Sequence, residues 1–168
     1  LAGEPTLPPE LMAANDNRLF YVQFKTDIIP EYRTALTRMG AEVLYHFPYQ
    51  SYLVRMDRGT VAKIEKEAYV RVVADMHLAY KLETAVVNDL LTGNNQVQTF
   101  DLMLANKAVD AAGVEAAVTE LGADLVGPAN GGVLVTMRGT AEQVATMARR
   151  NDVLWAEPLG EIGFDIDN

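Results

Sequence analysis

Apolar and polar residues follow a regular order from Leu19 onward. Leu19 to Phe24 is aromatic and β-branched, which is typical of a strand. Pro30 suits the first turn of a helix, and Gly40 ends the apolar helical spacing of Tyr32, Ala35, Leu36 and Met39. Thr60 is expected to cap a second helix, and further strands are expected over residues 41–47, 52–56 and 70–74. This order predicts one sheet covered by two helices on one face.

The same order of elements recurs in the second half. A strand is predicted over residues 97–104, and a helix with apolar positions at Val114, Ala117, Val118 and Leu121 ends at Gly122. A strand over residues 133–137 is followed by a helix that begins at Thr140, where Gln143 completes a capping box. The last strand is predicted over residues 153–156.

The recurrence is visible in the residues themselves. Residues 39–43 match 121–125, residues 52–56 match 133–137, and residues 58–60 match 138–140, each about 80 residues apart and in the same order. The sequence therefore predicts an α+β fold of two ferredoxin-like βαββαβ domains in tandem, each an antiparallel sheet with two helices on one face. The predicted parts are an extended N-terminal arm (1–18), a first domain (19–82), a linker with helical features (83–96), a second domain (97–158) and an extended C-terminal tail (159–168).

Composition narrows the classes of function. The absence of cysteine excludes disulfides and thiolate sites. The net charge of −9 is concentrated in residues 83–168, which carry −9 alone, while residues 19–82 carry +2. No basic stripe is available for phosphates, which argues against nucleic acid as a partner. No apolar run approaches the ~18 residues of a membrane span.

The chain offers few side chains for catalysis or cofactor binding. His46 and Ser51 flank a predicted hairpin turn, but nothing near Ser51 is typical of a nucleophile elbow, so we interpret both as hairpin residues. His46 and His77 are too far apart in sequence to form a metal-ligand motif, and no phosphate-binding glycine motif is present. We expect no catalytic residue, no metal and no cofactor, and thus a chain that is not itself an enzyme.

The order of the motifs resembles the propeptides of subtilisin-like serine proteases. In the first copy the resemblance rests on residues 20–24, 39–43, 51–56, 70–73 and 78–82. In the second copy it rests on the closing segment Val153-Leu154-Trp155-Ala156-Glu157-Pro158, which is similar to the last strand of such propeptides. The resemblance covers most of the chain after Leu19, through the order of the motifs rather than through any single one.

The resemblance implies an intramolecular chaperone and inhibitor. The sheet of such a domain docks on the catalytic domain, and the following tail lies in the active-site cleft. Trp155 and Glu157 would contact the protease, with Glu157 capping the N-terminus of a protease helix. The cleft-filling tail would contain Phe164, Asp165, Ile166, Asp167 and Asn168. The partner would be the catalytic domain of the same precursor, with neither nucleic acid nor membrane involved, and the location would be secreted or periplasmic in a bacterial-type cell.

Two other functions remain open from the sequence. The chain could be an accessory or targeting module that stays with the protease without blocking it, or a regulatory module that senses a small ligand. The sensing function predicts a glycine-rich loop after the first strand of each copy. Residues 25–29 and 105–109 contain no glycine, which counts against it.

The chain begins without Met or a signal-peptide pattern, as a processed precursor or a trimmed chain would.

Overall fold

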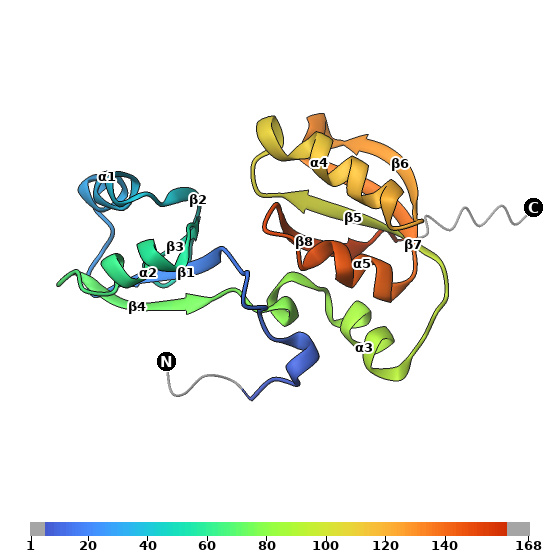
Figure 1. Ribbon diagram of the computed structural model, residues 1–168, viewed down its shortest axis with the longest axis horizontal. Coiled ribbons are helices and arrows are strands. Elements are labelled where there is room, and N and C mark those ends of the chain that lie inside the picture. Colours follow the sequence, from blue (N-terminus) through green and yellow to red (C-terminus); the bar gives the residue numbers. More distant parts are fainter. Residues whose placement is uncertain (1–5, 161–168) are drawn as a thin grey trace, which may run out of the picture. The chain divides into compact units, whose positions relative to one another are not determined.

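The computed structural model describes residues 6–160, which divide into two compact units (Figure 1). The first unit extends to Lys81 and includes residues 149–151; the second comprises the rest of the chain from Leu82. Each unit contains one four-stranded antiparallel sheet with its own helices. The predicted fold class, α+β with two ferredoxin-like domains, is confirmed.

The first unit has the strand order β2-β3-β1-β4. Its elements are η1 (Pro9–Leu11), β1 (Leu19–Phe24), α1 (Pro30–Met39), β2 (Glu42–Phe47), β3 (Ser51–Arg55), α2 (Arg58–Ile64), β4 (Val70–Asp75) and η2 (Leu78–Lys81). The core is formed by buried residues of the sheet and both helices, among them Phe20, Phe24, Leu36, Val54 and Ile64. Gly40 ends α1 in the left-handed conformation, as its position predicted.

The second unit repeats this arrangement with the strand order β6-β7-β5-β8. Its elements are α3 (Thr84–Thr92), β5 (Gln98–Leu104), α4 (Lys107–Glu120), β6 (Asp124–Ala129), η3 (Asn130–Gly132), β7 (Leu134–Gly139), α5 (Ala141–Ala148) and β8 (Val153–Pro158). Helices α4 and α5 cover the sheet and contribute fully buried valines to its core, as β5 contributes Phe100 and Leu102. No helix among the described residues is both long and apolar enough to cross a membrane.

Strand pairing fixes which residues of the two units correspond. Phe20 pairs with Val54 and Asp75, and Phe100 pairs with Met137 and Pro158 at the same point of the second sheet. The pairing of β1 with β4 shifts at Gln23/Phe24, and the pairing of β5 with β8 shifts at Met103/Leu104. The edge strands β4 and β8 therefore carry the same bulge. Tyr52 thus corresponds to Val135, and the match of residues 52–56 with 133–137 was wrong by two positions.

The helix that follows the third strand begins differently in the two units. In the first unit the cap is Asp57, whose Oδ1 accepts from the Thr60 backbone N–H at 2.7 Å, so the expected cap at Thr60 was wrong. A carboxylate is as good a cap as a hydroxyl, and Thr60 lies three residues further on. In the second unit the capping box is confirmed: Gln143 N–H donates to Thr140 Oγ1 at 3.2 Å, and Thr140 N–H to Gln143 Oε1 at 3.0 Å.

The segments before the two sheets are folded. Residues 6–18, expected as an extended arm, contain η1 and two buried side chains, those of Leu11 and Asn17. Before β5, Leu82 forms a parallel bridge with Ala156, and α3 packs on α5 and β8. The segment between the copies is therefore part of the second unit and is not a free connection.

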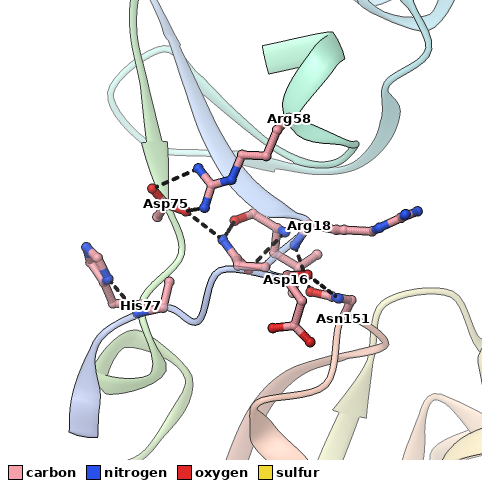
Figure 2. A network of polar contacts seen from close by, with 9 residues as sticks. Asp16, Arg18, Arg58, Asp75, His77 and Asn151 are labelled. Atoms are coloured by element: carbon pink, nitrogen blue, oxygen red, sulfur yellow. Dashed lines mark hydrogen bonds and ion pairs between the residues drawn. The ribbon is translucent and has the colours of Figure 1, made fainter. Parts of the chain in front are cut away.

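A polar network ties the N-terminal segment of the first unit to β4 (Figure 2). The Asn17 amide donates to Leu19 O at 2.8 Å and to Asp75 Oδ1 at 3.0 Å, and Asn17 Oδ1 accepts from Leu19 N–H at 3.1 Å. Arg58 pairs with Asp75 at 2.7 Å, and His77 Nδ1 accepts from Ala13 N–H at 2.9 Å. Burial acts to raise the pKa of Asp75, but hydrogen bonds from Arg58 and Asn17 and the Arg58 charge outweigh it and lower this pKa.

The lowered pKa of Asp75 makes the stability of the first unit depend on pH. The contribution of the carboxylate is present above the ordinary Asp pKa of about 4 and is lost as pH falls through the lowered folded-state value. Because the ion pair is partly solvated, Asp75→Asn should lower the free energy of unfolding by about 1 kcal/mol or less at pH 7. The difference between variant and wild type should shrink in urea titrations as pH falls below about 4. Arg58→Gln removes the other partner of the ion pair and should give a loss of similar size at pH 7. A difference between Asp75→Asn and wild type that is as large at pH 2 as at pH 7 would contradict the lowered pKa of Asp75.

Candidate functional site

The second sheet has one face that points away from its helices. Helices α4 and α5 pack against the face that carries Phe100 and Leu102, so the alternate residues of each strand lie on the other side. We call this other side the outer face. Residues paired across neighbouring strands share a face, and the pairing assigns to the outer face Asp101, Met103, Leu134, Thr136, Trp155 and Glu157.

Two rows cross the outer face from β7 through β5 to β8. The apolar row is Leu134, Met103 and Trp155, three partly buried side chains in register. The acidic row is Thr136, Asp101 and Glu157, of which Glu157 is exposed. An apolar band bordered by the exposed carboxylate of Glu157 is suited to a partner that offers apolar side chains together with an N–H donor or positive charge.

Both carboxylates of the acidic row are held by a donor from the same sheet. Trp155 Nε1–H donates to Glu157 Oε2 at 3.1 Å, along β8. Thr136 Oγ1–H donates to Asp101 Oδ1 at 2.6 Å, across from β7 to β5, and both of these side chains are buried. Because the donors are fixed in the sheet, the carboxylates have defined directions before any partner binds.

Sequence reasoning singled out part of this site. Trp155 and Glu157 lie on one face and bond to each other, whereas Asp101 and Thr136 were missed. Their signal was a carboxylate inside the apolar run Phe100-Asp101-Leu102, since an acid in the middle of a buried strand requires a partner. The expected tail residues Phe164, Asp165, Ile166, Asp167 and Asn168 lie outside the described residues.

The chain leaves the second sheet along β8. Leu159 N–H donates to Thr99 O at 2.8 Å, which continues the pairing of β8 with β5 past Pro158. The corresponding bond in the first unit joins Met76 N–H to Leu19 O at 3.0 Å. The segment that follows Glu157 therefore starts in extended conformation at the border of the outer face.

The first unit lacks the polar groups of this site. The shared bulge makes Val72 the counterpart of Trp155 and Ala74 the counterpart of Glu157. Tyr21 takes the place of Asp101 and packs its ring edge-on against Phe47, with ring centroids 5.4 Å apart. Where the second unit has the acidic row, the same backbone positions of the first unit hold Leu53, Tyr21 and Ala74, and the row beside them is Ser51, Gln23 and Val72.

The hairpin residues His46 and Ser51 are not brought together. His46 is paired with Tyr52 and Ser51 with Phe47, so the two side chains lie on opposite faces of the first sheet. Ser51 Oγ–H donates instead to Tyr49 O at 3.2 Å, and the His46 ring contacts Tyr52. Within residues 6–160, no group of three His, Asp or Glu side chains is arranged to hold a metal ion.

Comparison with known proteins gives one match, in the first unit. Residues 2–77 match the model of a domain of unknown function, DUF8729, which covers less than half of the chain. No curated protein and no solved structure matches the chain.

Proposed function

We propose that this chain is the propeptide of a subtilisin-like serine protease, acting as intramolecular chaperone and inhibitor. The second unit docks its outer face on the catalytic domain, and the tail after Leu159 lies in the active-site cleft. The proposal implies that the chain belongs to a secreted or periplasmic precursor and has no catalytic residue of its own. The first unit has Val72 and Ala74 in place of the Trp155–Glu157 pair, so the docking role is assigned to the second unit.

The observation that carries the proposal is the outer face itself. Its acidic row ends in the exposed carboxylate of Glu157, and two residues later the chain leaves the sheet in extended conformation. A carboxylate is stabilised at the N-terminus of a helix, where backbone N–H groups lack partners and the helix dipole is positive. An extended segment is bound in a cleft through backbone pairing, with side-chain pockets supplying selectivity.

Docking explains why a small unit of this kind would benefit from a partner. Each unit is small enough that its core alone gives modest stability. A partner that binds only the folded unit stabilises it by linkage, and the folded unit in turn stabilises the structure of the partner that it fits. This reciprocity is the physical basis of a chaperone function.

The proposal is tested by titrating the chain against the catalytic domain encoded downstream of Asn168, with hydrolysis of a peptide nitroanilide as readout. Glu157→Gln should weaken inhibition about tenfold, the equivalent of one charge-assisted hydrogen bond. A chain that ends at Pro158 should still bind but no longer block hydrolysis. Glu142→Gln, an exposed change on α5, is the matched control and should leave inhibition unchanged.

The alternatives predict different outcomes of the same titration. If the catalytic domain keeps full activity with saturating chain and the two form a complex on gel filtration, the chain is an accessory module rather than an inhibitor. Full activity without a complex, or a gene that encodes no protease after Asn168, would overturn the proposal.

A further inference from the structure

Trp155 contributes a hydrogen bond to the site as well as packing. Trp155 and Glu157 are separated by one residue of β8, and the indole N–H lies 3.1 Å from the Glu157 carboxylate. Trp155 is partly buried in the apolar row, in register with Met103, whereas Glu157 is exposed. An indole N–H is only a donor, so its hydrogen bond favours one direction of the carboxylate.

We infer that Trp155 is a positioning residue, which holds the Glu157 carboxylate in the direction needed for docking. This inference rests on the proposed function, in which Glu157 contacts the partner. An exposed glutamate free to rotate loses that freedom when it is fixed in an interface, and the loss weakens binding. A carboxylate already fixed through Oε2 loses less, because the sheet has ordered it in advance.

The internal repeat forms the same strand geometry without this pair. The first unit forms the same four-stranded sheet with the same bulge, although Val72 and Ala74 occupy the two positions. Neither the ring nor the carboxylate is therefore required for the strand geometry. Their hydrogen bond is a property of the surface, and a change at either position can be examined in a folded chain.

The unbound chain provides the first test. It contains a single tryptophan, so an NMR spectrum of the 15N-labelled chain shows one indole N–H signal. We expect this signal to change position in Glu157→Ala, which removes the acceptor of the indole N–H, while Glu142→Gln leaves it in place. An indole signal at the same position in the wild-type chain and in Glu157→Ala would overturn the inference without bearing on the proposed function.

Docking provides the second test, again with the catalytic domain encoded downstream of Asn168. Trp155→Phe keeps an aromatic ring and removes the donor; we expect it to weaken binding about threefold to tenfold, with an unchanged urea unfolding midpoint. In the Glu157→Gln chain the same change should have no further effect, because the carboxylate it positions is gone. Equal losses in both backgrounds would overturn the positioning role alone. Failure of the wild-type chain to bind would overturn the proposed function together with it.

Discussion

Phe100→Ala should unfold the second unit and leave the first folded. Phe100 is fully buried in the centre of β5, and truncation of a buried phenylalanine costs about 3–5 kcal/mol. That is most of the stability of a small domain, which lies at the lower end of about 5–15 kcal/mol. Trp155, the only tryptophan, reports on the second unit, so its emission should shift to the red in the variant without denaturant.

Phe20→Ala is the matched change in the first unit. Phe20 occupies the same position in β1, also inside the core, and its loss should remove the near-ultraviolet dichroism of the first unit's tyrosines. The Trp155 emission should stay native, because each unit has its own core. If Phe20→Ala shifted the Trp155 emission as far as Phe100→Ala does, the two units would unfold as one.

Asn17→Ala is expected to destabilise the first unit by about 3 kcal/mol. Its buried side chain bonds to the backbone N–H and C=O of Leu19 and to Asp75, and a buried group left without a partner costs about 1–3 kcal/mol. The Leu19 N–H should also exchange with solvent faster. Urea unfolding followed by tyrosine dichroism, with hydrogen exchange at Leu19, measures both effects.

Asn15→Ala is the control for that change, because Asn15 is exposed and lies in the same segment. It should leave the unfolding midpoint within about 0.5 kcal/mol of wild type. Equal effects of the two substitutions would mean that the hydrogen bonds of Asn17 do not fasten the N-terminal segment to β1.

Local signals in the sequence predicted the fold well, because each has one physical cause. Pro30 and Gly40 bound α1 as expected, and Thr140 and Gln143 form the expected capping box. The match of the two third strands was wrong by two residues, because residue 52 corresponds to residue 135 and not to residue 133. A strand shifted by two keeps the same side chains on the same face, so its apolar pattern cannot distinguish the two registers. Only the hydrogen-bonded pairing of Phe20 and of Phe100 fixes the correspondence.

The site was less accessible to sequence reasoning, because it combines residues from three strands. Trp155 and Glu157 are close in sequence and were found through a resemblance, whereas Asp101 and Thr136 are 35 residues apart and meet only through strand pairing. Their shared face follows from the pairing of β5 with β7 and β8. The bulge at Met103/Leu104 determines which residues of β8 lie on that face. A bulge leaves no reliable mark in an apolar pattern.

The bulge that both edge strands share bears on how the two copies could diverge. It sets the same alternation of side chains in β4 and β8, so Val72 and Trp155, like Ala74 and Glu157, occupy equivalent backbone positions. Mutation can therefore alter the surface of one copy while selection on the core continues unchanged in both. A duplicated domain built in this way can keep one copy for stability and let the other acquire a new specificity through a few substitutions.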